Sequence, residues 1–185
     1  MCFTRKILAD ALSRLNEPVA QYSLLQGKLH EVNVATDGKF QRLFKRLYKV
    51  RLSSIWLTPF FAVLQRHKSK GLKFDNALRQ LRQVTGRFEA SFASKLVATI
   101  DDSKPVIDQH VLRHAELRLP WYGAMNREAG IIDTYRRLEE WMSNLRQSEC
   151  GRNAIAAFRQ RFPATQISDA KILDFILWQI RNLDA

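Results

Sequence analysis

The spacing of apolar residues constrains the fold of this 185-residue chain more than any other feature of its sequence. Large apolar side chains recur at intervals of three and four along most of the chain, and the clearest set is Phe40, Leu43, Phe44 and Leu47. This spacing gathers apolar side chains on one face of an α-helix, whereas a half-buried strand would alternate apolar and polar residues. No segment shows that alternation, so we predict an all-α protein with short loops.

Prolines, glycines and capping residues indicate where the predicted helices begin and end. A first helix over Ile7–Leu15 should stop near Asn16–Pro18, because proline interrupts a helix interior. The turn sequence Thr36–Lys39 should separate the second helix from the third. Pro59 is expected in the first turn of a helix, and Ser168 is expected to cap the last one.

The length and composition suit a globular protein with a core of its own. An apolar content of 46% is typical of folded domains, and 185 residues can form one body or two small lobes. We expect a single all-helical domain over residues 1–185 that acts as a monomer.

Cysteine and hydropathy patterns exclude several classes of protein. The two cysteines, Cys2 and Cys150, are too few for a four-thiolate zinc or iron–sulfur site, and they suggest no secreted disulfide framework. We therefore expect no metal and no cofactor, and a cytoplasmic location. The first residues lack the long apolar run of a signal peptide, and nothing in the sequence predicts a membrane span.

The charge is strongly positive and unevenly distributed. The formal net charge is +12, and residues 1–100 contain 18 Lys and Arg against 6 Asp and Glu. Residues 101–185 contain 12 of each kind, so the whole excess lies in the first part of the chain. Such asymmetry indicates one basic surface of the kind that nucleic-acid-binding proteins present, and we expect duplex DNA as the partner.

The predicted helix near Phe40 carries cations opposite its apolar face. A second group of cations lies in the loop sequence Gln65–Lys73. We expect these residues to contact DNA phosphates. The candidate phosphate ligands are Lys39, Arg42, Lys45, Arg46, Lys49, Lys68 and Lys70.

The middle of the chain predicts a helical hairpin. A helix that begins at Phe74 should end at the tight turn Thr85–Arg87, and a second helix should run from Phe88 to Ile100. Such a turn leaves backbone N–H groups available, and the second helix points its positive dipole end outward. The turn could therefore hold one DNA phosphate, with Arg87 adding a charged hydrogen bond. An ordinary helical hairpin without this function has the same sequence pattern.

The stretch KPVIDQHVLRH, Lys104–His114, follows the hairpin and places Asp108 before a predicted helix. An aspartate in that position commonly acts as a helix N-cap. The order of hairpin, helix, short turn and this stretch resembles the helix-hairpin-helix DNA glycosylase superfamily. There a catalytic aspartate lies in a context of the form P-x-x-D-x-x-V-x-R, which Pro105, Asp108, Val111 and Arg113 match. The resemblance is closest to the adenine-mismatch glycosylases and covers roughly residues 74–117.

The resemblance implies a helical glycosylase-like fold and excision of a damaged or modified base. Asp108 would stabilise positive charge at the anomeric carbon or orient the attacking water. The base would first be flipped out of the duplex into a pocket.

Several positions depart from the family pattern. Bifunctional members carry a nucleophilic lysine two positions after the hairpin glycine, where this chain has Phe88. Lys95 lies about two helical turns later and is interpreted as a helix-surface residue. The hairpin reads Gln83–Gly86, QVTG, so the first of two family glycines is missing, and the iron–sulfur cysteines of some relatives are absent too. The resemblance therefore implies a monofunctional enzyme, or a catalytically inactive protein on the same fold.

Four further residues are weaker candidates. Glu89 should lie in the first turn of the second hairpin helix, where it either favours the helix dipole or faces the base pocket. Arg113 could contact phosphate or form an ion pair with a carboxylate. Trp121 and Tyr122, in the sequence LPWYGAMNR, either stack on a flipped base or pack beneath a loop.

Three functions remain open from the sequence. The first is a monofunctional DNA glycosylase, which the Pro105–Arg113 segment favours. The second is a non-enzymatic DNA-binding protein on the same fold, which Phe88 and the altered turn favour. The third is a basic protein-interaction module, whose binding to DNA would lack strong salt dependence.

Overall fold

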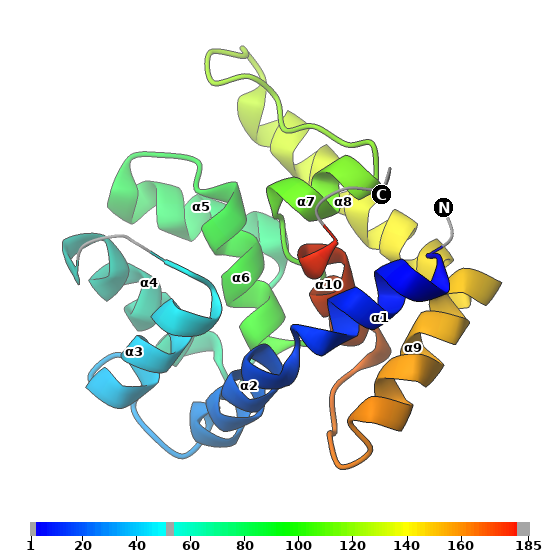
Figure 1. Cartoon of the computed structure of the whole chain (residues 1–185). Coiled ribbons are helices and arrows are strands. Elements are labelled where there is room, and N and C mark those ends of the chain that lie inside the picture. The colour runs from blue at the N-terminus through cyan, green and yellow to red at the C-terminus, as the bar shows by residue number, and fades with distance from the viewer. Residues whose placement is uncertain (1–2, 51–53, 181–185) are drawn as a thin grey trace. The chain divides into compact units, whose positions relative to one another are not determined.

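The structure, a computed structural model, describes residues 3–50 and 54–180, and its regular secondary structure there is entirely helical (Figure 1). The prediction of an all-α protein is therefore confirmed. No helix in these two ranges is both long enough and apolar enough to cross a lipid bilayer. The helices are α1 (Arg5–Ser13), α2 (Asn16–Leu29), α3 (Gly38–Leu47), α4 (Ser54–His67), α5 (Phe74–Thr85), α6 (Ala90–Ile100), α7 (Gln109–His114), α8 (Arg127–Gln147), α9 (Glu149–Arg161) and α10 (Asp169–Gln179).

The chain divides into two compact units. Unit 1 consists of residues 1–18 and 102–185, and unit 2 of residues 19–101. The second boundary, between Asp101 and Asp102, falls inside the segment 74–117 that resembles the glycosylases. The hairpin helices α5 and α6 therefore belong to unit 2, whereas α7 belongs to unit 1.

Unit 2 has an aromatic core between α3 and α4. The Phe44 ring lies 5.0 Å from the Phe60 ring and 5.4 Å from the Phe61 ring, measured between centroids. Phe40 and Phe44 have no exposed surface. Aromatic pairs at these distances add to the free energy gained by burying their large apolar area. Helices α4, α5 and α6 pack on one another, so the hairpin rests on this core.

Unit 1 is built around α10, which packs against α1, α7, α8 and α9 (Figure 1). The expected Ser168 cap is confirmed, because the Ser168 hydroxyl oxygen accepts a hydrogen bond from the Lys171 backbone N–H at 3.1 Å. Residues 170–177 are all buried, so the helix is surrounded by the rest of the fold. A helix in this position needs apolar side chains on every face, and the sequence KILDFILW supplies most of them.

Two expected helix boundaries were wrong, and a third was right for one helix only. Helix α1 stops before Asn16, as expected, but Asn16–Pro18 also begins α2, and proline is tolerated there because the first-turn N–H groups have no intrahelical partner. Pro59 lies inside α4, beyond its first turn. Helix α6 begins at Ala90 rather than Phe88, so Glu89 is its N-cap residue.

Candidate functional site

The turn between α5 and α6 depends on Gly86. Its φ of 72° is left-handed, and its N–H donates to the Arg82 carbonyl at 2.8 Å, which closes the end of α5. A Cβ at this position would meet no neighbouring atom, so backbone conformation, rather than lack of space, favours glycine. The predicted hairpin is thus confirmed, and Gly86 is its left-handed residue.

The donors of this turn are not all available. The Thr85 hydroxyl donates to the Leu81 carbonyl at 2.8 Å, and its oxygen accepts from the Arg87 N–H at 3.3 Å. With the Gly86 N–H also bonded, two of the turn's backbone donors have partners inside the hairpin. Our expectation that the turn leaves these N–H groups free was therefore wrong for Gly86 and Arg87. The Arg87 side chain is exposed.

The N-cap residue of α6 does not cap the first turn of the helix with its own side chain. Glu89 occupies the N-cap position, is half-buried, and makes no side-chain capping hydrogen bond. The positive end of the helix dipole therefore remains available to an anion near Arg87. Phe88 is covered by the Arg82 guanidinium, which lies 4.2 Å from the ring centroid. No amine occupies the position of the family lysine.

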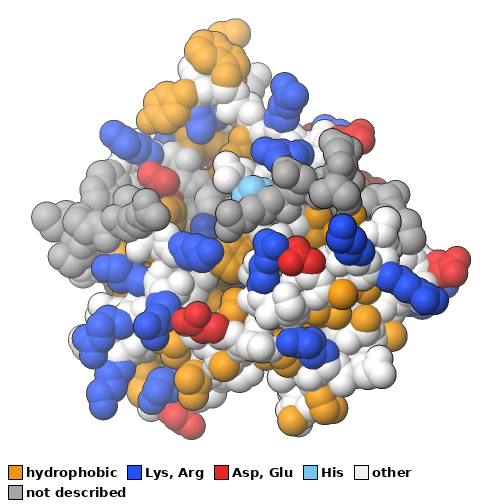
Figure 2. Space-filling model, in the orientation of Figure 1, with side chains coloured by type: hydrophobic (Ala, Val, Ile, Leu, Met, Phe, Trp, Pro, Cys, Tyr) orange, Lys and Arg blue, Asp and Glu red, His pale blue; other side chains and the backbone are white. Residues whose placement is uncertain are grey.

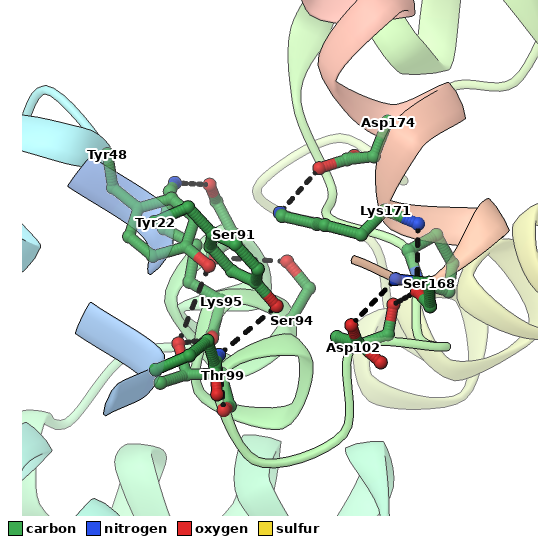
Figure 3. Close-up of polar contacts among 12 residues, drawn as sticks. Tyr22, Tyr48, Ser91, Ser94, Lys95, Thr99, Asp102, Ser168, Lys171 and Asp174 are labelled. Carbon is green, nitrogen blue, oxygen red and sulfur yellow. Dashed lines mark hydrogen bonds and ion pairs between the residues drawn. The ribbon is translucent and has the colours of Figure 1, made fainter. Parts of the chain in front are cut away.

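Lys95 is more enclosed than a surface lysine. It is half-buried, and its ammonium donates to the Ser91 hydroxyl at 2.5 Å, one turn earlier on α6 (Figure 3). The same ammonium lies 5.3 Å from the Phe92 ring centroid. On the next turn the Thr99 hydroxyl donates to the Lys95 carbonyl at 2.7 Å and lies 3.4 Å from the Tyr48 hydroxyl. These contacts hold Lys95 along its own helix.

Asp108 begins α7 and caps it. One carboxylate oxygen, Oδ1, accepts from the His110 N–H at 2.8 Å, so the N-cap interpretation is confirmed. The side chain is half-buried, and in the part of the chain that the structure describes Oδ2 has no hydrogen-bond donor. Capping therefore uses one oxygen and leaves the other for a further partner.

Buried residues on both sides hold Asp108 in place. Pro105, Val106 and Ile107 before it are buried, and the Tyr135 hydroxyl donates to the Pro105 carbonyl at 3.2 Å. After it, Val111 is fully buried on α7. A carboxylate between two such anchors is held in a fixed position, which a catalytic group requires.

A hollow of about 500 Å³ lies beside α7 and the loop that follows it. Its walls combine apolar side chains with cations, and Gln109, which directly follows Asp108, lies at its edge. Arg113 is exposed and lines the hollow. The remaining lining residues are Leu112, Glu116, Leu117, Arg118 and Leu119.

Helix α3 presents the expected basic face. Its N-cap, Asp37, accepts from the Phe40 N–H at 2.6 Å, while Phe40, Phe44 and Leu47 are buried. Lys39, Arg42, Arg46 and Lys49 are exposed, and Lys45 is half-buried. Figure 2 shows Lys and Arg side chains gathered over the region where α3 lies in Figure 1. The structure thus brings these five candidate residues onto one surface of unit 2.

The two loop lysines have different surroundings. The Lys68 ammonium donates to the carbonyl oxygens of Leu29 and Val32 at 3.0 and 2.6 Å. It therefore neutralises the negative end of α2 and fixes the chain that follows, which is a structural role. Lys70 is exposed and remains a candidate for phosphate contact.

Trp121 and Tyr122 are not packed beneath the loop. They are 74% and 72% exposed, and both belong to the segment between α7 and α8.

The candidate residues are divided between the two units. The hairpin turn, Glu89 and the basic face of α3 lie in unit 2. Asp108, Arg113, Trp121 and Tyr122 lie in unit 1.

Sequence reasoning missed a buried ion pair in α10. The Lys171 ammonium donates to Asp174 Oδ2 at 2.7 Å, and the two side chains are 1% and 10% exposed (Figure 3). At the start of the same helix, the Ser168 N–H donates to Asp102 Oδ2 at 3.0 Å. Opposite charges three positions apart within the apolar run KILDFILW could have revealed the pair, because such spacing brings them together on a helix.

No group of three or more His, Cys, Asp or Glu side chains that could hold a metal ion occurs within the described ranges, and Cys2 lies outside them. Comparison with protein-family models, curated proteins and solved structures finds no match to the chain.

Proposed function

We propose that this protein binds duplex DNA and acts as a monofunctional DNA glycosylase. The proposal rests on the position and surroundings of Asp108. It lies 22 positions after the hairpin glycine, is held by buried neighbours, and has one carboxylate oxygen without a hydrogen-bond donor among the described residues. A carboxylate near DNA phosphates is electrostatically unfavourable, so a catalytic role would explain its presence better than capping alone.

In the proposed reaction, the bond between the deoxyribose anomeric carbon and the base breaks, and the base leaves with the bonding electron pair. Asp108 stabilises the positive charge that develops on the sugar and orients a water molecule. The water oxygen bonds to the anomeric carbon, and the departing base gains a proton. The product is an abasic site, because Phe88 offers no amine for a covalent intermediate.

The basic face of α3 would supply the non-specific part of DNA binding. Its cations are positioned by the buried Phe40 and Phe44 on the opposite side of the helix. Phosphate contacts of this kind orient a protein on the duplex without reading sequence. The start of α6, where the Glu89 side chain makes no capping hydrogen bond, is with the exposed Arg87 the second place where a phosphate would bind.

A catalytically inactive DNA-binding protein is the second candidate. It is favoured by the hairpin turn, where the N–H groups of Gly86 and Arg87 have partners within the turn. In that case Asp108 serves only to cap α7.

The deciding experiment compares Asp108→Asn with the parent protein. Asparagine keeps an oxygen that caps the helix but removes the negative charge, so α7 should form normally. The proteins are incubated with duplexes that carry a panel of damaged and modified bases, and alkali then cleaves any abasic sites. We expect excision by the parent on at least one duplex and a loss of at least about 100-fold in Asp108→Asn, within the range that a positioned catalytic group contributes.

The matched control is Asp37→Asn. Asp37 caps α3 in the same way that Asp108 caps α7, but nothing places it in the chemistry. This variant should retain excision within about twofold. DNA binding without excision on any duplex would leave the inactive DNA-binding protein as the better description. Equal excision by Asp108→Asn and its parent would instead remove Asp108 from the mechanism.

A further inference from the structure

The loop between α7 and α8 exposes three large apolar side chains. Trp121, Tyr122 and Met125 are 74%, 72% and 99% exposed, and all lie within five positions. The loop extends beyond the helices of unit 1 in Figure 1, and Figure 2 shows hydrophobic side chains at the same place. Single exposed apolar residues are ordinary, but a cluster of this kind on a protruding loop marks an interaction site.

The loop is held in one conformation at its base. The Ala124 N–H donates to the Trp121 carbonyl at 3.2 Å. The Thr134 hydroxyl, which donates to the Gly130 carbonyl at 2.8 Å, also lies 3.3 Å from the Arg118 carbonyl. Pro120 lies against Gly130, where a Cβ would approach its ring to 3.1 Å. The aromatic side chains therefore extend from an ordered support.

Trp121 is also supported by its own loop. Its indole lies directly against Gly123, and a Cβ at Gly123 would clash with the ring. Gly123 thus acts as a positioning residue, because any side chain there would displace the indole. The indole rests against the loop at Gly123, while most of its surface stays exposed to a ligand.

Tyr122 is backed by a cation. The Arg127 guanidinium lies 4.5 Å from the Tyr122 ring centroid, within the range of a cation–π contact. Two of its nitrogens, Nε and Nη1, are buried and have no hydrogen-bond partner among the described residues. The buried guanidinium therefore supports the Tyr122 ring from one side, and an exposed ring supported in this way suits the face of a nucleotide base.

We propose that the loop Pro120–Asn126 is a stacking platform for unpaired nucleotides of DNA. Trp121 and Tyr122 stack on bases, Arg127 supports the Tyr122 ring, and the exposed Arg118 binds an adjoining phosphate. Within a duplex, neighbouring base pairs cover both faces of each base. The platform should therefore bind single-stranded DNA more tightly than duplex DNA. The inference rests on the DNA-binding part of the proposed function and requires no catalysis by Asp108.

The test measures binding to a fluorescein-labelled single-stranded 20-mer of mixed sequence and to the corresponding duplex, by fluorescence anisotropy with the full chain. Trp121→Ala should weaken single-strand binding at least about fivefold, the lower end of what one stacked base contributes, and change duplex binding less than twofold. Trp121→Phe should restore most of the affinity, because a flat ring is retained. Gly123→Ala should weaken single-strand binding by displacing the indole.

Leu24→Ala is the matched control, since Leu24 is a large apolar residue that is 59% exposed on α2. It should bind both DNA forms as the parent does. Equal single-strand binding by Trp121→Ala and the parent would overturn the inference. Persistent duplex binding in that case would leave the proposed function standing.

Two further outcomes would also overturn it. Failure of the parent to bind either DNA form would remove the inference and the proposed function together. Binding to vesicles of phosphatidylcholine and phosphatidylglycerol that is lost in Trp121→Ala, with unchanged oligonucleotide binding, would identify the loop as a lipid contact instead.

Discussion

Lys171 and Asp174 pair within α10, where both side chains are largely removed from water. Moving two charges out of water costs several kcal/mol, and their attraction offsets this cost only while both partners are present. The Lys171 ammonium also lies 5.0 Å from the Phe175 ring centroid, a further favourable contact. The pair therefore makes the stability of α10 depend strongly on either residue alone.

We expect Asp174→Ala to lower the free energy of unfolding by about 3 kcal/mol, because it leaves the Lys171 ammonium without its carboxylate. Urea denaturation followed by circular dichroism measures the change. The double variant Lys171→Met, Asp174→Ala should recover most of the loss, since no charge then stays buried. A single-variant loss below about 1 kcal/mol would indicate that water reaches the ammonium.

Single residues with a local role were the most predictable from sequence. Asp108, Ser168 and Gly86 act within a few positions of themselves, as caps and as a turn residue, so neighbouring residues suffice to identify them. The role of Lys68 depends on carbonyl groups more than 30 positions away, at the end of α2. A local pattern contains no information about such partners, and Lys68 was therefore interpreted only as a DNA contact.

At the scale of elements, α3 has two roles, because one of its faces packs in the core of unit 2 and the other carries cations. Its apolar side chains fill the aromatic core of unit 2, and its last turn carries Lys45 and Arg46, where cations favour the helix dipole. Burial of the apolar face fixes the rotation of α3 about its own axis. The cations on the opposite face are therefore held toward solvent. The periodicity of the sequence predicted both faces correctly.

We expect replacement of the five α3 cations by glutamine to weaken duplex DNA binding and to flatten its salt dependence. Each lost phosphate contact should reduce the slope of log K against log salt by about 0.9. The control variant replaces five exposed arginines on α8 and α9 in unit 1 and should retain the slope. These residues are Arg136, Arg137, Arg146, Arg152 and Arg161. An unchanged slope in the α3 variant would contradict the assignment of this face to DNA.

Helix α9 was absent from our sequence interpretation. Its buried residues include Cys150, Gly151 and Ala154, which are small and do not form a conspicuous apolar stripe. A Cβ at Gly151 would clash with the Leu145 carbonyl at the end of α8, so the helix depends on close backbone approach. Periodicity of large side chains detects helices that bury large side chains, and it misses helices that pack through small ones.

At the scale of the whole molecule, charge follows the division into units. Unit 2 contains 15 Lys and Arg against 5 Asp and Glu, whereas unit 1 contains 15 against 13. Non-specific attraction to DNA should therefore come chiefly from unit 2, while the candidate catalytic carboxylate belongs to unit 1. Sequence composition showed the asymmetry. The boundary between Asp101 and Asp102 lies in the connection between α6 and α7, which resembles the connections within each unit, so the sequence did not mark it as a division.

In the proposed reaction, the chemistry of the product depends on whether a side-chain amine can act as the nucleophile. Asp108 of unit 1 is the proposed catalytic carboxylate, and Phe88 of unit 2 occupies the position of the family amine. Lys95 is the nearest lysine after Phe88 in the sequence, and its ammonium bonds to Ser91 on its own helix. An enzyme with this arrangement should release the base without forming a covalent bond to the sugar.

We therefore expect that borohydride, added during excision, traps no covalent complex of protein and DNA. The DNA strand should stay intact until alkali cleaves it, because water rather than an amine takes the place of the base. Denaturing gel electrophoresis of labelled duplex measures both outcomes. A trapped complex that disappears in Lys95→Gln, with Asp108 intact, would show that Lys95 is a nucleophile and that the enzyme is bifunctional. A trapped complex that persists in that variant would place the amine elsewhere in the chain.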